Sequence, residues 1–585
     1  MKTITGVCII IVGILLISGL FVSGIFTKEQ APIPPVHVSI LAINDFHGHL
    51  SAGQQLNNRS AGSAAILASD LKSAMHASNA TFTILALVGD TIGASPRNTS
   101  LLMDEPTILF FNEFANSDCA SGTDAKHSRC NVIAIPGNHE FNRGTGELLR
   151  MTYGGNGNTM IPHVVDPYSG SLADTLCANV VWKENKTPIL PPYTIREVDG
   201  VPMAFIGAVT RETTTLELPL NIESVEFINE SETINRYVTE LQRQGVHAFV
   251  ILLHEGANQE VPYDGPTRPG GNVTGPVGSV VSCLDPDVDV VLAAHWHRFT
   301  NAYLKNAGGN DVLVTQAPSY GMAYVDVDLR IDQQSGDIIE KSATIVPVYA
   351  DPASGAAPDP ETEVFIGDVE RGVSRMTSEV IATLTTNITR TPNPAGESAL
   401  GDLVADSQRT VMNADVAFVT SGPGTGSLHA DLARGNISWN DLEAVLPSDT
   451  SMAADYGGWY SRPRVATREL SGNQIKKILE RQWEEPLPGE NLSVSGLTYS
   501  WDPSQPTGIR VTGIRVNGSP LDANATYSAA MNYYMAYGMG DYAPAWDWNV
   551  TVTIGPSDID ALIAYIRSLP APLDVTTEGR VRIAA

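Results

Sequence analysis

Residues 131–144 read NVIAIPGNHEFNRG, a stretch in which a short apolar run stops at a glycine and is followed at once by Asn138, His139 and Glu140. Short apolar runs closed by glycine are typical of buried strands. In open α/β sheets, ligands bind at the carboxyl ends of the strands. The stretch therefore predicts a buried strand that delivers polar side chains to a binding site, and other strands should end there in the same way.

Further apolar runs along the chain also end in side chains that commonly bind metals. With the first run, they supply Asp45, His47, Asp90, Asn138, His139, His254, His295 and His297. A single histidine at a strand end is most simply a core or loop residue, but its repetition favours one shared site. A pair of divalent cations requires a carboxylate that can bridge, imidazole ligands and open positions for water and substrate. Two carboxylates leave two such cations with net positive charge, so the site should attract anions, phosphate esters foremost.

Composition and segment patterns indicate two domains of mixed structure. The chain has 585 residues, 43% of them hydrophobic, which is enough for two sizeable cores. From residue 37 to about 350, strand-like runs alternate with amphipathic segments, an α/β pattern. The Pro- and Gly-rich stretch YADPASGAAPDP then indicates a boundary, and a stretch with helical spacing follows it, so residues 351–384 are predicted to form a linker and connecting helix. Mixed helix and strand are expected over residues 385–585.

The order of the strand-end motifs, D-x-H, G-D, G-N-H-E, H and H-x-H, resembles that of the calcineurin-like metallophosphoesterases. The C-terminal patterns ESALGDLVAD, ADLARGNISWNDLEAVLP and NYYMAYGMGDY are similar to those of the 5'-nucleotidase family, and the likeness spans nearly all of residues 37–580. This resemblance implies an α/β fold with an N-terminal four-layer metallophosphoesterase β-sandwich flanked by helices over residues 37–350. It implies a second, α+β domain of the 5'-nucleotidase type over residues 385–585 that binds the substrate.

The resemblance also implies a role for each strand-end residue. One ion would be held by Asp45, His47 and His297, the other by Asn138, His254 and His295, and Asp90 would bridge the two. His139 would hydrogen-bond the phosphoryl oxygens, whereas Glu140 is expected to be structural or to support the ligands. The ions are divalent, and histidine-rich mixed ligation admits Zn, Mn, Fe or Co. The implied reaction is the hydrolysis of nucleotide phosphate esters, as in a 5'-nucleotidase.

Departures from the family pattern leave two other functions open. Many relatives read G-N-H-E-F-D, whereas Asn142 stands here in place of the last Asp, and this form is similar to the 2',3'-cyclic phosphodiesterase and 3'-nucleotidase branch. In the second domain, His429 stands where a nucleotide-binding Arg is usual. The second stacking ring would be Tyr533 or Tyr534, and Asp541 is a shifted candidate for the ribose hydroxyls. The alternatives are therefore a phosphodiesterase or phosphatase for another ester, and a catalytically weak surface binding protein.

The N-terminus and the cysteines suggest an exported protein. Residues 4–26 form an uncharged apolar run whose length favours an uncleaved membrane anchor over residues 1–30, with a cleaved signal peptide as the alternative. Asn-x-Ser/Thr sequons such as Asn58 agree with export and glycosylation. Cys119 and Cys130 flank a polar loop and are predicted to pair, and Cys177 and Cys283 are paired by elimination, with four free thiols as the other reading.

The charge of the chain limits its partners. A formal net charge of -28 argues against a basic surface that would bind a nucleic acid polymer. The expected partners are a small nucleotide or another phosphate ester, and a membrane through the N-terminal run.

Overall fold

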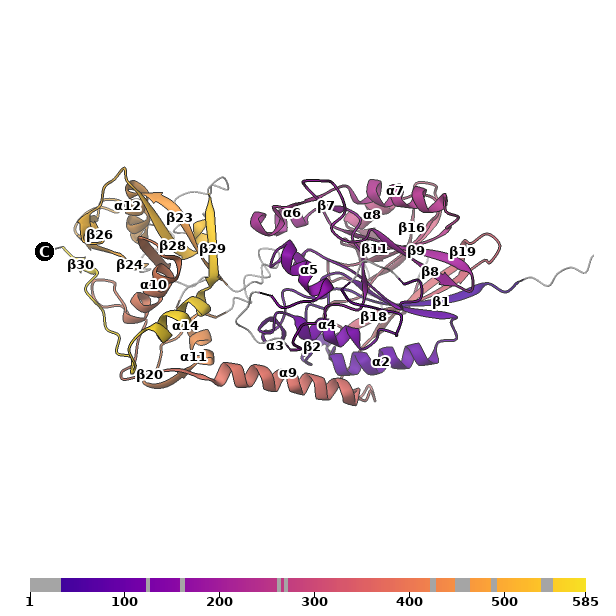
Figure 1. Cartoon of the computed structure of the whole chain (residues 1–585), viewed down its shortest axis with the longest axis horizontal. Coiled ribbons are helices and arrows are strands. Elements are labelled where there is room, and N and C mark those ends of the chain that lie inside the picture. Colours follow the sequence, from indigo (N-terminus) through magenta and orange to yellow (C-terminus); the bar gives the residue numbers. More distant parts are fainter. Residues whose placement is uncertain are drawn as a thin grey trace, which may run out of the picture.

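The computed structural model describes residues 33–122, 127–157, 164–259, 265–267, 272–420, 428–447, 463–484, 492–537 and 551–584. The chain forms two lobes, and the long helix α9 (Pro360–Ser378) runs along one side of the first lobe to the edge of the second (Figure 1). The predicted N-terminal anchor lies outside the described residues. Within those residues, no helix combines the length and apolar character needed to cross a bilayer.

Two large sheets form the first lobe. In spatial order, the first sheet contains β13 (Gly265–Pro266), β19 (Ile338–Pro347), β18 (Ala323–Ile331), β1 (Val36–Ile43), β4 (Phe82–Val88), β5 (Val132–Ile135) and β6 (Asp174–Thr175). The second contains β16 (Thr300–Lys305), β17 (Asp311–Gln316), β15 (Val288–Ala293), β11 (Ala248–His254), β9 (Val201–Val209) and β8 (Tyr193–Val198). The central strands β1, β4 and β5 are parallel, as are β9, β11 and β15, so their carboxyl ends lie at one edge of each sheet.

Alternating side chains along each strand create three packed interfaces. Val38 and Ile40 of β1 face the other sheet and meet Val250 of β11 in the central core. Leu41 and its odd-numbered neighbours point to the opposite face, against α2 (Ala64–Ala77) and α4 (Glu105–Asn112). The outer face of the second sheet is covered by α7 (Glu230–Gln242) and α8 (Pro276–Val281). Because both sheet faces are buried, the strands are almost wholly apolar, and the predicted four-layer sandwich is confirmed.

Shorter elements complete the first lobe. They are the hairpin β2 (Gln54–Leu56) and β3 (Arg59–Ala61), the pair β7 (Val180–Trp182) and β10 (Val225–Phe227), the pair β12 (Asn258–Gln259) and β14 (Val273–Thr274), and the helices α3 (Arg97–Ser100), α5 (Thr145–Tyr153), α6 (Thr213–Leu216), η1 (His139–Phe141) and η2 (Pro219–Ile222). Of these, η1, α6 and η2 border the strand ends where the predicted site residues lie.

Helix α9 connects the lobes where the sequence predicted a connecting helix. It begins cleanly because the Asp359 side chain accepts a hydrogen bond from the Thr362 N–H and Pro360 occupies the first turn. Val369 and Val373 of α9 pack with Leu101 of the first lobe and with apolar residues of the second. The helix therefore connects the two lobes and packs against both of them.

The second lobe has an α+β architecture, also as predicted. Its main sheet runs β24 (Leu492–Ser495), β21 (Val416–Thr420), β28 (Thr526–Asn532), β23 (Arg464–Ser471) and β29 (Val552–Ser557). A second sheet runs β27 (Ser519–Pro520), β26 (Val511–Val516), β25 (Leu497–Trp501) and β30 (Val581–Ile583), and β20 (Val380–Leu384) pairs with β22 (Gly435–Ser438). The helices are α10 (Ala399–Met412), α11 (Trp439–Val445), α12 (Gly472–Glu480), η3 (Arg481–Trp483), α13 (Tyr533–Ala536) and α14 (Asp558–Ser568).

One of the two predicted disulfides is present. Cys119 and Cys130 are bonded, which confirms the pairing predicted from their shared loop. The pairing of Cys177 with Cys283 is wrong, because both are free thiols. Cys177 is fully buried in an apolar cluster beside Phe141, whereas Cys283 is exposed after α8. Elimination failed because it uses no information on distance, and a disulfide requires its two Cα atoms to lie within about 7 Å.

Candidate metal centre

The predicted ligands come together at the carboxyl edges of the two facing sheets. Strand β1 leads to Asp45 and His47, β4 to Asp90, β5 to Asn138, β11 to His254, and β15 to His295 and His297. Their side-chain atoms form three overlapping groups that could hold a metal ion: Asp45, His47 and His297; Asp90, His254 and His295; and His47, Asp90 and His139. Within each group the ligand atoms lie within 4.8 Å of one another.

The backbone at these strand ends is strained. Asp45, His47, Asp90, His295 and His297 have φ angles of 50°, 48°, 47°, 74° and 54°. A positive φ is uncommon outside glycine and costs of order 1–3 kcal/mol per residue. Strain of this kind gathers at functional sites, where it aims a side chain that an unstrained loop would point elsewhere. Here it turns neighbouring ligands toward the same space.

Two glycines allow the strand-end loops to approach closely. A Cβ added to Gly89 would lie 2.5 Å from Nδ1 of His254, and one added to Gly137 would lie 2.6 Å from the backbone N of Asp90. Both distances are shorter than real Cβ contacts. The glycines of the G-D and G-N-H-E motifs are therefore required by packing between the ligand loops.

The first ligand group presents two imidazole nitrogens to a common point. Nε2 of His47 lies 3.1 Å from Nε2 of His297, and Nε2 of His297 lies 3.7 Å from Oδ1 of Asp45. His47 Nδ1 lies 2.8 Å from the Gly93 carbonyl oxygen, so Nδ1 carries the proton and donates it there. This leaves the Nε2 lone pair of His47 directed at the site, as metal ligation requires.

The second set of expected ligands contains a buried polar atom without a hydrogen bond. Oδ1 of Asn138 has no hydrogen-bond partner among the described residues. The Val88 carbonyl oxygen accepts from Nδ1 of His254 at 2.9 Å, so Nε2 is the nitrogen turned toward the site, where it lies 3.2 Å from Oδ2 of Asp90. Buried polar atoms are nearly always satisfied, so the unsatisfied Asn138 oxygen, together with the His254 nitrogen beside Asp90, matches the donor set of a divalent cation.

Electrostatics favour the neutral, metal-binding form at His47 and His295 but not at His254. At His254 burial lowers the pKa, but the neighbouring Asp90 carboxylate outweighs it and raises the pKa to about 10. A cation bound there would replace that proton. Burial lowers the pKa of His47 well below its usual value, and it lowers the pKa of His295 to about 3. Both imidazoles are therefore neutral, the form that binds metal. At Asp90 burial raises the pKa, but the neighbouring His254 and His139 outweigh it and hold the pKa well below its usual value. Asp90 is thus ionised and placed between both ligand groups.

His139 occupies the same space as the ligands but has partners of its own. Its backbone N–H donates to Oδ1 of Asp90 at 2.8 Å, and its Nδ1 lies 2.9 Å from Oδ1 of Asn142. The Asn142 amide in turn donates from Nδ2 to Oε1 of Glu217 at 2.6 Å. Nδ1 of His139 is thus occupied by Asn142, and the grouping of His139 with His47 and Asp90 would allow its other nitrogen to bind metal.

Glu140 is a structural clamp. Its Oε1 accepts the N–H groups of Thr91 and Ile92, at 2.8 and 3.2 Å, and its Oε2 accepts those of Asp90 and Gly137, at 3.0 and 2.5 Å. One buried carboxylate thus binds the loop after β4 to the loop after β5. The motif showed that Glu140 was present, but the identity of its partners depends on the tertiary structure.

Three residues that support the site were missed by sequence reasoning. Asn44 donates to Oδ2 of Asp45 at 2.7 Å and to the Ala317 carbonyl oxygen at 2.8 Å. The Tyr320 ring lies 5.3 Å from the His297 ring. Glu217 follows α6 and contacts Asn142. Asn44 could have been noticed as a polar residue directly before Asp45, whereas no local pattern marks Tyr320 or Glu217.

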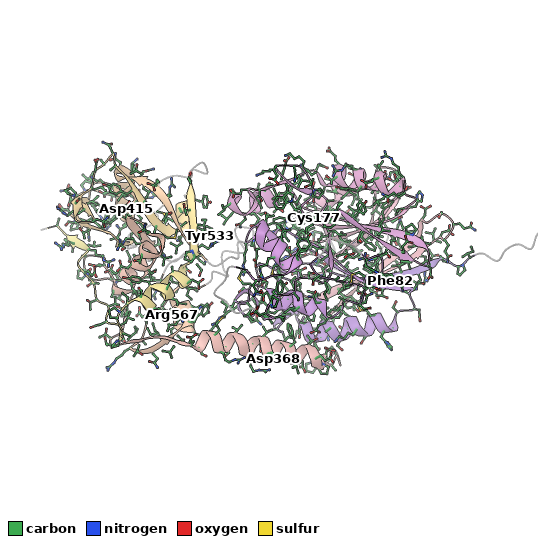
Figure 2. The ribbon with its side chains drawn as sticks, viewed as in Figure 1. Phe82, Cys177, Asp368, Asp415, Tyr533 and Arg567 are labelled. Carbon is green, nitrogen blue, oxygen red and sulfur yellow. A yellow bond between two sulfur atoms is a disulfide. The ribbon has the colours of Figure 1, made fainter. Side chains whose placement is uncertain are left out.

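The predicted substrate-binding residues lie in the second lobe. Tyr533 is 1% exposed and packs into the core of the main sheet, on the side of its lobe that faces the first lobe (Figure 2). The His429 backbone N–H donates to the Val445 carbonyl oxygen, and the side chain is exposed. Asp541 and the side chain of Tyr534 lie outside the described residues. The role of these residues in substrate binding stays a prediction.

Sequence comparison agrees with this architecture. Residues 38–299 match the calcineurin-like phosphoesterases, and residues 380–546 match the C-terminal domain of 5'-nucleotidases. The chain belongs to the 5'-nucleotidase family of metallophosphoesterases. The resemblance seen in the strand-end motifs is therefore confirmed, and members of this family are metal-dependent phosphoesterases.

Individual relatives of this family differ in name and length. Endonuclease YhcR of Bacillus subtilis is 31% identical over 574 residues, which cover 96% of this chain and 42% of that protein. A cell wall protein of Listeria monocytogenes is 29% identical over 591 residues, covering 95% of this chain and 70% of that protein. The chain thus spans less than half the length of the Bacillus relative. The structure of Haemophilus influenzae NAD nucleotidase shares the fold, with a TM-score of 0.50, 19% identity and coverage of 92% and 97%.

Proposed function

We propose that this chain is an exported phosphohydrolase that uses two divalent metal ions to hydrolyse nucleotide phosphate esters, with 5'-nucleotides as the first candidate substrates. The observation that carries the proposal is the convergence of buried Asp and His ligand atoms, which lie within 4.8 Å of one another in each of three groups, together with the Asn138 Oδ1 that has no hydrogen bond among the described residues. A binding protein without a catalytic centre has no need of such a cluster or of such an unsatisfied oxygen. This argues against the catalytically weak binding protein.

In this proposal the residues hold the metals as two sets. Asp45, His47 and His297 would bind one ion, Asn138, His254 and His295 the other, and Asp90 both. When bound, the ions supply positive charge and a water molecule of lowered pKa. The metal identity is Zn, Mn, Fe or Co, since mixed nitrogen and oxygen ligation admits each of them.

The remaining chemistry belongs to His139. Its Nδ1 donates to Asn142, so Nε2 is the nitrogen that faces the substrate, and it donates to a phosphoryl oxygen when the ring carries a proton on both nitrogens. That hydrogen bond strengthens as negative charge builds on the transferring group, which is the condition for lowering the barrier rather than merely binding substrate. The small space beside His139 is lined by Asn142, Arg143 and Ser95, among others.

The test is phosphate release from 5'-AMP, 3'-AMP and 2',3'-cyclic AMP, before and after removal of metal with a chelator and after its return. The proposal expects activity that disappears with the metal, highest on 5'-AMP. His254→Ala is compared with His247→Ala, which alters a half-exposed histidine beside Asp287 outside the site. Only the first should lose metal and activity. Turnover that is indifferent to chelation would overturn the proposal.

Two alternatives correspond to separate results of the same experiment. Highest turnover on 2',3'-cyclic AMP or 3'-AMP would assign the chain to the cyclic phosphodiesterase and 3'-nucleotidase activity that Asn142 suggests. Cleavage of single-stranded DNA or RNA would match the name of the Bacillus relative. The net charge of -28 disfavours a polymer substrate, because phosphate backbones are bound by basic surfaces.

Export rests on the apolar run at residues 4–26 and on the cell wall name of the Listeria relative. The disulfide between Cys119 and Cys130 agrees with an oxidising compartment. Fractionation of cells into cytosol, membrane and medium distinguishes an anchored from a secreted form. Recovery in the cytosol would contradict export.

A further inference from the structure

A chain of three side chains leads from the reaction space into the protein. Nδ1 of His139 meets Oδ1 of Asn142 at 2.9 Å, and Nδ2 of Asn142 meets Oε1 of Glu217 at 2.6 Å. Glu217 is 5% exposed and follows helix α6, while the other two residues lie in the loop after β5. Asn221 joins the arrangement, because its Nδ2 donates to the Asn142 carbonyl oxygen at 2.8 Å and lies 3.3 Å from Oε2 of Glu217.

The carboxylate of Glu217 determines which way the Asn142 amide faces. A carboxylate only accepts hydrogen bonds, so it selects the NH2 end of the amide. The amide oxygen must then face His139, and it can only accept, so Nδ1 of the imidazole must carry a proton. This supports the doubly protonated ring, which alone can donate from Nε2 while Nδ1 donates to Asn142. If Glu217 were absent, the amide could rotate and offer its NH2 group to Nδ1, which would remove the proton from Nδ1 and disfavour the doubly protonated ring.

The same arrangement explains how Asn142 can stand where many relatives have an aspartate. An aspartate holds the histidine directly with a charge, whereas an asparagine brings no charge. Here the charge lies one residue further away, on the Glu217 carboxylate when it is ionised, and reaches His139 through a polarised amide. Hydrogen bonds to charged groups are roughly twice as strong as neutral ones, and burial of Glu217 excludes the water that would compete.

We propose that Glu217 is a positioning residue that orients His139 through Asn142 and so replaces the aspartate partner that relatives place beside this histidine. The inference rests on the proposed function of His139 as the group that contacts the phosphoryl oxygens. It assigns to Glu217 an effect on turnover rather than on substrate or metal binding, because Glu217 contacts neither.

A double-mutant cycle tests the coupling. Because burial raises the pKa of Glu217 to about 8, turnover is compared at a pH of about 9, where the wild-type carboxylate is ionised. Glu217→Gln in the wild-type background removes the charge and should lower kcat by roughly 10-fold with KM and metal content unchanged. In the Asn142→Asp background, two carboxylates stand in contact, so the same Glu217→Gln change relieves repulsion and should raise kcat. The doubly substituted enzyme, in which the new carboxylate accepts from both of its neighbours, should come within about 3-fold of wild type.

Equal losses from Glu217→Gln in both backgrounds would overturn the proposal. If Glu217→Gln alone fails to fold, the doubly substituted enzyme decides by itself, since a loss beyond roughly 10-fold would refute the coupling. Glu223→Gln is the matched control: Glu223 is exposed on the same segment, and its change should leave kcat at the wild-type value.

A measurement that needs no turnover separates this inference from the proposed function. The ¹⁵N chemical shifts of the His139 ring, assigned with the His139→Ala variant, show which nitrogen carries the proton. We expect Nδ1 protonation in the wild type and a loss of that preference in Glu217→Gln. An unchanged tautomer would refute the inference even in an active enzyme, and the expected change would support it even if no phosphate ester tested were hydrolysed.

Discussion

Replacing Glu140 by glutamine should loosen the loops that carry Asp90 and Asn138. The Glu140 carboxylate is 8% exposed and accepts four backbone N–H groups, two on each oxygen. Glutamine keeps one acceptor oxygen and turns the other into an NH2 group, which then opposes two N–H donors. The change removes two hydrogen bonds to a charged group and leaves the donors buried.

The expected cost follows from those two bonds. Hydrogen bonds to charged groups contribute about 1.5–3 kcal/mol each, so the loss is about 3–6 kcal/mol. Total stability of a domain is only about 5–15 kcal/mol, so the variant should be severely destabilised at the strand ends. Because burial raises the pKa of Glu140 to about 7, the comparison is made at a pH of about 8, where most of the wild-type carboxylate is ionised.

Hydrogen exchange of peptides that cover the ends of β4 and β5 measures this effect locally. We expect a large loss of protection there, together with reduced metal content. Glu226→Gln serves as the control, because this exposed carboxylate pairs with exposed Lys186 and its change should leave protection unaltered. The role of Glu140 in holding the two loops together would be refuted if Glu140→Gln kept full metal content and its hydrogen-exchange protection stayed within about 1 kcal/mol of wild type.

Three further results are expected. His139→Ala should keep near-wild-type metal content while turnover falls roughly 100- to 1,000-fold, the usual effect of losing one transition-state donor; loss of an ion by mass spectrometry would instead make His139 a ligand. His254→Ala should lose metal and activity together, and full metal occupancy would contradict its role. Burial raises the pKa of Asp402 from 3.8 to about 8, with Arg580 opposing the rise and the neighbouring Glu397 adding to it. The folded state therefore holds a proton that the unfolded chain releases, and the free energy of unfolding should fall as pH rises between these two pKa values. Calorimetry of Asp402→Asn should show a smaller fall over the same pH range. An unchanged dependence of the unfolding free energy on pH would exclude Asp402 as its source.

The sequence by itself determined the fold class and the set of candidate ligands. Each candidate ligand, such as Asp90 or His254, lies at the end of the apolar strand that positions it. A stretch of a few residues therefore predicts both the strand and the ligand at its end. The carboxyl ends of parallel strands meet at one edge of a sheet, which made it possible to predict that motifs far apart in the chain converge. The packed layers were implied by the resemblance to the metallophosphoesterases and not by side-chain periodicity, because strands buried on both faces read as continuous apolar runs.

Only the tertiary structure decided which groups support that set. Glu217 and Asn142 are separated by 75 positions, and nothing near Glu217 in the sequence indicates that they touch. The failure to pair Cys177 with Cys283 has the same origin, since one thiol is buried in the core and the other lies at the surface. Proximity between distant segments depends on how all the layers pack together, and a one-dimensional pattern carries the identity of a side chain but not the partner that it will meet.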